Sequence, residues 1–248
     1  GKMSDVKMRL LVAVYLLFGI SYVESQVPVL TPSILYVNQG QTGTYNCNVG
    51  VKNNHATWFL RQTPGKAPQL ILRHHHTYTE PGYGPGISSA HFGSTINAAG
   101  TEYLLTVKNT DTQDTDTYYC VKWYDNIGFV FSQSSKLIVT VDKFPEPALL
   151  VFPPYTEDNE SKDSSTLTCH ISKLAVSLVN VNWLKDGTTL QDGVSTSNPV
   201  RESDNTFSMS SYLTLSSKDI NKDSLYSCMI QQEGSSAFVS KGVKLSQC

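Results

Sequence analysis

The sequence predicts an all-β protein built from two consecutive antiparallel β-sandwiches. Three observations carry this prediction. Short segments in which apolar and polar residues alternate fill the chain, with turn residues between them and no long helical periodicity. One pattern of cysteine, tryptophan and tyrosine occurs twice. A proline-bearing stretch, residues 142–147, separates the two occurrences and is typical of a linker between domains.

The first occurrence of the pattern lies between residues 47 and 120. Trp58 follows Cys47 by eleven residues, and Tyr118 precedes Cys120 by two. This order is typical of an immunoglobulin-type Greek-key sandwich, in which the tryptophan packs on a disulfide between the two sheets. The separation of 73 positions between the cysteines fits the nine-strand variable type.

The second occurrence lies between Cys169 and Cys228. Trp183 follows the first of these cysteines by fourteen residues, and Tyr226 precedes the second by two. The shorter separation of 59 residues fits the seven-strand constant type. In both halves we expect the tyrosine to form a tyrosine corner, with its hydroxyl bonded to the backbone a few residues upstream.

Alternating segments mark the strands in order along the sequence. In the first half they include residues 44–49, 103–107 and 136–141, with a hairpin turn at 63–66. In the second half they are residues 149–152, 166–171, 179–184, 207–215 and 226–231.

The first 25 residues have the features of a signal peptide. Lys7 and Arg9 precede an apolar run, residues 10–20, and small residues precede a cut before Gln26. The run is too short for a bilayer, which needs about 20 residues. We therefore expect a signal peptide with upstream residues at 1–25, a variable-type domain at 26–141 and a constant-type domain at 142–248. A retained signal anchor is the alternative.

Composition and net charge indicate which kinds of binding partner are disfavoured. Charged residues make up 16% of the chain, and its formal net charge is −2. Nothing in this balance points to nucleic acid or to an anionic membrane surface. No stretch after the leader is long and apolar enough to span a membrane, so we expect no direct membrane insertion and an oxidising, extracellular compartment.

Several segments give the protein a resemblance to a known family. The most specific are residues 62–68 (QTPGKAP), 114–120 (DTDTYYC) and 210–215 (SSYLTL). Together with the domain order and a terminal cysteine, they resemble an immunoglobulin light chain over essentially all of residues 26–248. The sequence of residues 70–92 is similar to that of bony-fish light chains of the sigma type.

The resemblance implies a disulfide-linked heavy chain as partner and an antigen as ligand. Cys248 would be the interchain cysteine, because the other four cysteines form the two internal disulfides. The expected heavy-chain interface comprises Gln62, Pro68, Tyr119, Phe131, Phe152, Ser208, Ser210 and Tyr212. Ser208, Ser210 and Tyr212 share one strand face by their period of two.

Three loops at one end would form the antigen-binding surface, at about residues 49–57, 74–79 and 121–130. Large aromatic and adaptable polar side chains are typical of such surfaces. The candidate contacts are Asn53, Asn54, His74, His75, Tyr78, Lys122, Trp123, Tyr124, Asp125 and Asn126. We expect Trp123 and Tyr124 to be the anchors.

The sequence leaves two registers for the strand near residue 58, which differ in the residue that faces the core. Counted forward from Cys47, Trp58 is the core residue, whereas counted back from the turn at 64–65, Phe59 takes that place. Side chains on a strand alternate faces, so a slip of one residue reverses every assignment. We favour Trp58 in the core, with an extra residue before the turn.

Two serines depart from the family pattern. Ser132 and Ser134 stand where the family has the glycines of a β-bulge. A serine forced into left-handed backbone angles costs about 1–2 kcal/mol, so we expect strain, a lost bulge or shifted pairing between variable domains.

A histidine and a glutamine also depart from the pattern. His91 stands where the family commonly has an arginine that pairs with the acid before the tyrosine corner, here Asp114. At its ordinary pKa a histidine is charged only near or below pH ~6.5, so we expect a pH-sensitive lower core. Gln232 stands where the constant-domain signature usually ends in histidine.

Other chemistry has weak support. His74, His75 and His76 are consecutive and so point different ways, and no cysteine or acid follows at ligand spacing; we expect no metal and no cofactor. No nucleophile elbow or phosphate loop indicates an enzyme. Asn159 begins a glycosylation sequon, Asn-Glu-Ser.

The leading interpretation is therefore an immunoglobulin light chain, secreted or held at the cell surface through its heavy chain. An invariant surrogate-type light chain that assists heavy-chain assembly is the alternative, and the two serines keep it open. A T-cell-receptor-like protein is disfavoured because no membrane anchor follows the constant domain. A secreted hydrolase would need a catalytic triad in a pocket, which the sequence does not show.

Overall fold

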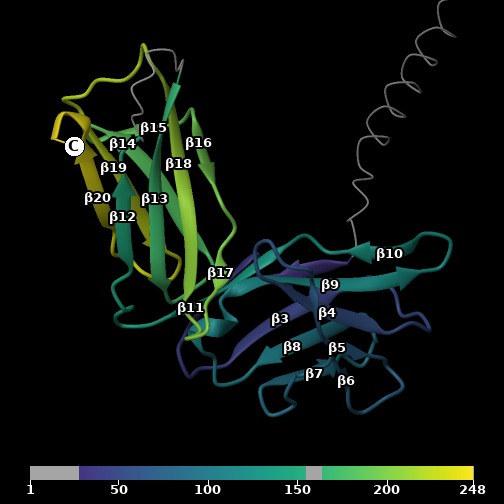
Figure 1. Ribbon diagram of the computed structural model, residues 1–248. Coiled ribbons are helices and arrows are strands. Elements are labelled where there is room, and N and C mark those ends of the chain that lie inside the picture. Colours follow the sequence, from purple (N-terminus) through teal and green to yellow (C-terminus); the bar gives the residue numbers. More distant parts are fainter. Residues whose placement is uncertain (1–27, 155–163, 248) are drawn as a thin grey trace, which may run out of the picture.

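The computed structural model describes residues 28–154 and 164–247, and it confirms the predicted all-β fold of two sandwiches (Figure 1). Residues 1–25, Asn159 and Cys248 lie outside this part of the sequence. The first lobe contains β1 to β11 and the second β12 to β20. Among the described residues, no helix has the length and apolarity needed to cross a membrane.

The first lobe has two sheets. One is ordered β1-β3-β8-β7, and the other β2-β11-β9-β4-β5-β6 with β10 added beside β9. This is the variable-type arrangement, in which extra strands extend the sheet beyond β4. The bounds are β1 (Val29–Thr31), β2 (Ile34–Asn38), β3 (Gly43–Asn48), β4 (Thr57–Gln62), β5 (Gln69–His74), β6 (Gly82–Tyr83), β7 (Phe92–Ile96), β8 (Glu102–Val107), β9 (Asp116–Tyr124), β10 (Gly128–Phe131) and β11 (Ser135–Thr140), with the short helix η1 (Thr112–Asp114) before β9.

The second lobe pairs two sheets, ordered β12-β13-β18-β16 and β15-β14-β19-β20, with β17 beside β18. This is the constant-type arrangement with one short added strand, β15. The bounds are β12 (Ala148–Phe152), β13 (Ser164–Leu174), β14 (Val179–Lys185), β15 (Thr188–Leu190), β16 (Val194–Thr196), β17 (Val200–Arg201), β18 (Phe207–Ser216), β19 (Leu225–Gln232) and β20 (Val239–Lys244), followed by the helix η2 (Leu245–Gln247).

The core of the first lobe forms around the Cys47–Cys120 disulfide, and Phe59 takes the place expected for the core tryptophan. Phe59 is 0% exposed and lies opposite Cys120, whereas Trp58 is half-buried on the other face of β4. The preference for Trp58 in the core is therefore wrong. The expected extra residue before the turn is also absent, since β4 pairs with β9 without a shift; a bulge lies instead on the neighbouring strand, where Ile71 and Leu72 are both buried opposite Phe59.

The core of the second lobe follows the prediction. Trp183 is fully buried and lies opposite Cys228 of the Cys169–Cys228 disulfide. Its indole Nε1 donates to the Ser211 hydroxyl at 3.0 Å, so the polar edge of this side chain has a partner inside the core.

Both tyrosine corners are present. The Tyr118 hydroxyl donates to the carbonyl oxygen of Asp114 at 2.8 Å. The Tyr226 hydroxyl accepts from the backbone N–H of Asn221 at 3.0 Å. The tyrosine hydroxyl is thus the hydrogen-bond donor in the first corner and the acceptor in the second.

A bulge separates β10 from β11. Phe131 lies opposite Val121 of β9, and Ser135 lies opposite Tyr118 of β9. The segment from Phe131 to Ser135 therefore contains one residue more than the part of β9 that it pairs with, which defines a bulge. Neither Ser132 nor Ser134 has a positive φ. The expected strain and the expected loss of the bulge are therefore both wrong.

The Ser132 hydroxyl explains why serine is accommodated there. Ser132 is buried, and its N–H donates to the Cys120 carbonyl oxygen at 2.8 Å. Its Oγ accepts from the N–H of Cys120 at 3.0 Å and donates to the carbonyl oxygen of Gln133 at 2.8 Å. The side chain thereby satisfies backbone groups that a bulge leaves unpaired.

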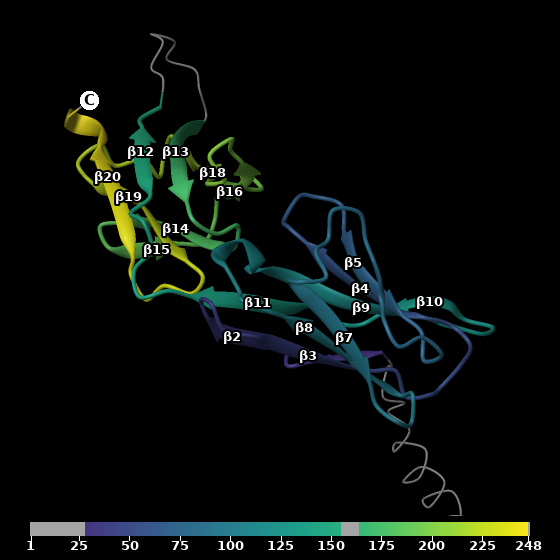
Figure 2. The ribbon, with the colours of Figure 1, turned by 90° about the horizontal axis from the view of Figure 1, so that it is seen from below.

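The two lobes meet at the end of β11, which lies next to the second lobe in both views (Figures 1 and 2). Ile138 and Phe144 are buried there, close to Gly234 of the turn between β19 and β20. Lys136 Nζ lies 3.4 Å from Glu233 Oε1, and the Ser177 hydroxyl donates to the carbonyl oxygen of Thr115 at 3.4 Å. Apolar and polar contacts therefore both join the lobes.

Candidate functional site

One sheet face of the first lobe carries an exposed aromatic cluster. On β4 and β9 the side chains of Gln62 and Tyr119 face outward and are half-buried. Trp123 is 37% exposed, and Phe129 and Phe131 of β10 are each 56% exposed. Pro68 is also exposed. Large apolar side chains gathered on one face indicate an interaction surface rather than scattered exposure.

Neighbouring rings order this aromatic cluster. The rings of Trp123 and Phe129 meet edge to face with centroids 4.9 Å apart, and Trp58 meets Phe129 at 6.2 Å. Such edge-to-face pairs hold rings in a fixed orientation. The cluster therefore presents a shaped surface to whatever covers it.

The second lobe has a smaller apolar face on β12 and β18. Phe152 is 49% exposed and Tyr212 is 39% exposed. They lie on either side of Thr168 of β13, on the same face of the sheet. Ser208 and Ser210 lie on the same face of β18 as Tyr212 and are half-buried. The predicted shared face of Ser208, Ser210 and Tyr212 is therefore present, and Phe152 lies on the same face.

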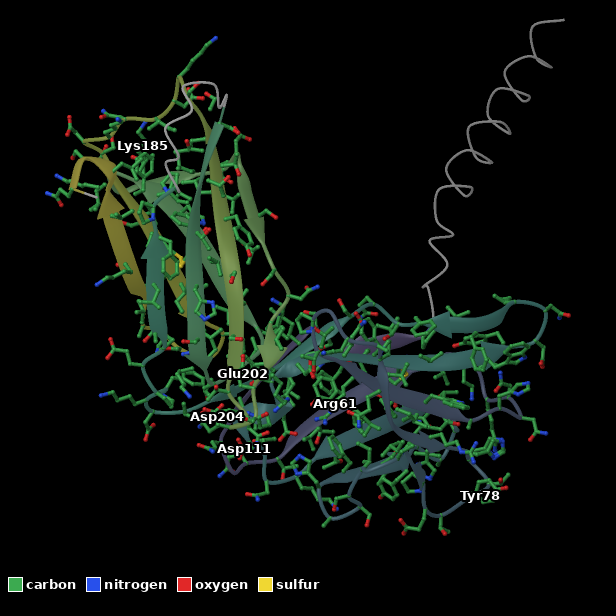
Figure 3. All side chains as sticks on the ribbon, viewed as in Figure 1. Arg61, Tyr78, Asp111, Lys185, Glu202 and Asp204 are labelled. Carbon is green, nitrogen blue, oxygen red and sulfur yellow. A yellow bond between two sulfur atoms is a disulfide. The ribbon has the colours of Figure 1, made fainter. Side chains whose placement is uncertain are left out.

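The three expected loops come together at the end of the first lobe that lies away from the second lobe, where Figure 3 labels Tyr78. His55 Nε2 lies 2.9 Å from Asp125 Oδ1, and the side-chain amide of Asn53 donates to the Trp123 carbonyl oxygen at 2.8 Å. These bonds tie the first loop to the third.

The loops border a cavity of about 610 Å³. Its lining includes Asn54, His55 and His75 from the loops, together with Tyr78 and Trp123. Asp125 and Asn126 are exposed at the tip of the third loop. A concave site with aromatic walls and several polar groups has the composition of a ligand-binding surface.

Three of the candidate contacts are buried, and the expectation that they meet a ligand is wrong. Counting by twos from the inward-facing Cys120 puts Lys122 and Tyr124 on the inner face of β9, at 0% and 8% exposure. The Tyr124 hydroxyl donates to the Val49 carbonyl oxygen at 2.9 Å. His74 is 3% exposed. These side chains support the loops from beneath.

Lys122 is a buried amine beneath the first loop. Its Nζ donates to the His55 carbonyl oxygen and lies 5.2 Å from the ring centroid of Tyr103. No salt bridge joins it to any carboxylate in the described part of the sequence. Burial lowers the pKa of Lys122 to about 8, because a charged amine is disfavoured away from water.

Of the three consecutive histidines, His74 points into the lobe, whereas His75 and His76 lie side by side, so the expectation that all three point different ways is met only in part. His74 lies inward, where its ring nitrogens bond to the Ser94 hydroxyl at 3.0 Å and the Tyr78 carbonyl oxygen at 3.2 Å. Burial is the main cause that lowers the pKa of His74. His75 and His76 stack with centroids 4.4 Å apart. Within the described residues, no cluster of His, Cys, Asp and Glu could hold a metal ion.

The predicted pair between His91 and Asp114 is present, with Nε2 2.8 Å from Oδ1. Sequence reasoning missed a second cation, since Arg61 NH1 lies 3.9 Å from the same carboxylate oxygen. The other oxygen of Asp114 accepts the N–H of Asp111 at 2.8 Å. Arg61 could have been found by counting two residues from the core position at Phe59.

Gln232 has a structural role in the second lobe. It is buried, and its side-chain oxygen accepts the backbone N–H of Ala175 at 2.7 Å. An amide can therefore occupy the position where the family usually has histidine.

Comparisons with known proteins bear on the second lobe. Residues 149–235 match the family model described as the immunoglobulin C1-set domain. The protein is also similar to the C region of the Ig kappa-b4 chain of Oryctolagus cuniculus, with 38% identity over 94 residues. That similarity spans 38% of this protein and 88% of the relative. Together with the two disulfide-centred sandwiches, these matches show that the chain belongs to the immunoglobulin family.

Proposed function

We propose that this protein is an immunoglobulin light chain that pairs with a heavy chain and contributes half of an antigen-binding site. The observation that carries the proposal is the exposed aromatic face of β4, β9 and β10, which adjoins the three loops. A second variable domain placed on this face would bury it and complete the cavity at its edge. The proposal assigns no catalytic role to the protein.

The domain order follows from the same proposal. Residues 1–25 would be a signal peptide with upstream residues, 26–141 a variable domain and 142–248 a constant domain. The protein would be secreted, or held at the cell surface through its heavy chain. Its similarity to a kappa C region supports a light-chain role, and residues 70–92 support a bony-fish, sigma-like subtype.

The heavy-chain interface would use both lobes. In the first it would comprise Gln62, Pro68, Tyr119 and Phe131, and in the second Phe152, Ser208, Ser210 and Tyr212. Aromatic residues are enriched in interface centres because they bury much area. The antigen contacts would be Asn53, Asn54, His75, Tyr78, Trp123, Asp125 and Asn126, of which Trp123 is the central anchor.

Assembly with a heavy chain tests the interface directly. The full-length protein would be co-expressed with a heavy chain, and the fraction co-purified would be compared for F131D and L225D. Leu225 is 40% exposed at the start of β19, outside the proposed interface, and serves as the matched control. We expect F131D to lower the assembled fraction at least tenfold and L225D to leave it unchanged. Equal assembly of both variants would contradict the proposal.

Cys248 would supply the covalent link to the heavy chain. In non-reducing electrophoresis we expect the wild-type light chain to migrate with the heavy chain and C248S to migrate alone. Free migration of the wild-type protein without a reductant would rule out this role.

An invariant surrogate-type light chain remains the second candidate. The intact bulge at Ser132 removes the structural reason for it, because the serines do not distort the strand pairing. Sequencing many transcripts from one animal separates the two. Diversity confined to residues 121–130 supports antigen binding, and invariance supports the surrogate role.

A further inference from the structure

A second cavity lies at the junction of the two lobes, away from the antigen-binding loops. Its volume is about 520 Å³. The first lobe contributes the end of β4, the hairpin turn after it and η1, and the second lobe contributes β17 and the loop that follows. Figure 3 labels Arg61 at this junction, with Glu202 and Asp204 on the facing lobe. The lining is Arg61, Thr63, Lys66, Ala67, Gln69, Gln113, Asp116, Arg201 and Asn205.

The cavity has one arginine from each lobe, and both side chains are held in place. Arg61 Nε donates to the side-chain oxygen of Gln69 at 3.0 Å, and its guanidinium lies 6.0 Å from the ring centroid of Phe92. The Arg201 guanidinium lies 4.5 Å from the ring centroid of Phe207, a buried residue of β18. A guanidinium fixed by stacking is already oriented for a ligand.

The two arginines are not neutralised equally. Arg61 has Asp114 as a partner, but Arg201 forms no salt bridge within the part of the sequence that the structure describes. The pKa of Arg201 is lowered, first by partial burial and then by the charge of Arg61, and the charge of Asp116 partly opposes this shift. The fold therefore holds two like charges near one another, and Lys66 adds a third cation to the lining.

The nearby acids have hydrogen bonds of their own, although the charge of Asp116 also acts on both arginines. Asp116 is the one carboxylate among the lining residues, and it accepts bonds from the Thr63 hydroxyl at 2.8 Å and the N–H of Thr117 at 3.0 Å. Glu202 accepts from the Ser208 hydroxyl, and Asp204 pairs with Lys173. Neither of these last two acids lines the cavity. The lining therefore has an excess of positive charge.

We propose that this cavity binds a small multivalent oxoanion, such as inorganic phosphate, between Arg61 and Arg201 with Lys66 beside them. Arginine is suited to this ligand because its planar fork of N–H groups matches the oxygens of phosphate. The anion bridges the two lobes and offsets the repulsion between their arginines. It therefore stabilises the junction, independently of any antigen or heavy chain.

Titration of inorganic phosphate into the full-length protein tests the site. Binding is measured by calorimetry at constant ionic strength in chloride, which controls for general screening. Sulfate is a second oxoanion probe and is expected to compete with phosphate. The variants are R201Q and K66Q, and the matched control is K218Q, which removes an exposed lysine elsewhere in the second lobe.

We expect R201Q to weaken phosphate binding at least tenfold, K66Q to weaken it about threefold, and K218Q to leave it unchanged. Without phosphate, R201Q is expected to unfold at the same or a higher temperature than wild type, because one like charge is gone. If R201Q does not fold, K66Q alone carries the test, since Lys66 is exposed. Equal phosphate affinity in wild type and in the folded variants, or binding that chloride reproduces, overturns the proposal.

Discussion

Phe59 and Trp58 are adjacent on β4, so their side chains lie on opposite faces of the sheet, and only one of them can stabilise the core. Phe59 is 0% exposed between the two sheets of the first lobe, whereas Trp58 lies on the outer face beside Phe129. Removing a buried aromatic side chain leaves a cavity as well as losing its transfer free energy. The two residues should therefore respond very differently to truncation.

We expect F59A to lower the free energy of unfolding of the first lobe by about 3–5 kcal/mol, the usual range for a buried phenylalanine. W58A should lower it by less than about 1 kcal/mol, as is common for residues outside the core, and should instead weaken pairing or ligand binding. Denaturant unfolding followed by circular dichroism compares the two. A larger loss of stability in W58A would show that the strand register is the other one.

Lys122 gives the first lobe a pH dependence with a defined sign. Its pKa in the folded state is about 8, against an ordinary value of 10.5. Below pH 8 both states bind the proton, so the folded state carries the full cost of burying the charge. Between pH 8 and 10.5 the folded amine loses its proton while the unfolded one keeps it. The contribution of Lys122 to the free energy of unfolding therefore rises with pH between pH 8 and 10.5.

K122M should remove this dependence. Relative to the variant, wild type should gain up to about 3 kcal/mol in free energy of unfolding from pH 7.5 to 10.5, from the linkage between pKa and stability. Chemical unfolding at several pH values measures the difference, which cancels the titration of the tyrosines common to both proteins. The exposed Lys108 provides the control. A constant difference between wild type and K122M, like that for K108M, would show that Lys122 is not buried as a cation.

At the scale of elements, the bulge between β10 and β11 depends on one hydroxyl. Ser132 Oγ accepts the N–H of Cys120, next to the disulfide. Without that oxygen, a buried donor is left unpaired, which costs about 1–3 kcal/mol. Ser134 is exposed in the same bulge.

We therefore expect S132A to lower the free energy of unfolding of the first lobe by about 1–3 kcal/mol, and S134A to change it by less than about 0.5 kcal/mol. Hydrogen exchange of the Cys120 amide gives a local readout and should become faster only in S132A. Equal stability of the two variants would mean that water or the backbone replaces the hydroxyl.

The elements also show what the sequence could and could not predict. Alternation and the repeated cysteine pattern predicted both sandwiches, because side chains of period two must bury one face. The register of β4 was missed because the count from Cys47 and the count from the turn at 64–65 disagreed, and the count from the turn, which gives Phe59, was the correct one. The Ser132 bonds depend on backbone groups brought together by folding. The inward position of Lys122 was predictable from Cys120, but composition suggested a ligand contact instead.

At the scale of the whole molecule, the junction between the lobes is close-packed at Gly234. This residue has φ +90°, and an added Cβ would lie 2.9 Å from the Val139 carbonyl oxygen and 3.1 Å from Ile138 Cγ2, both in the first lobe. Gly187 has a similar φ of +83° but nothing within 4 Å of an added Cβ. The two glycines thus share a backbone conformation and differ in their surroundings.

We expect G234A and G187A each to lose about 1–2 kcal/mol of stability in the second lobe through backbone strain, and only G234A to separate the lobes. Displacing Gly234 from Ile138 should expose the linker, so hydrogen exchange of residues 138–144 should speed up several-fold in G234A and stay unchanged in G187A. Hydrogen exchange of residues 138–144 in the wild-type protein gives the reference rate for both variants. Unchanged exchange in G234A would mean that contacts such as Lys136 with Glu233 suffice to hold the lobes together. The packing of one turn against β11 would then not set how the two domains are joined.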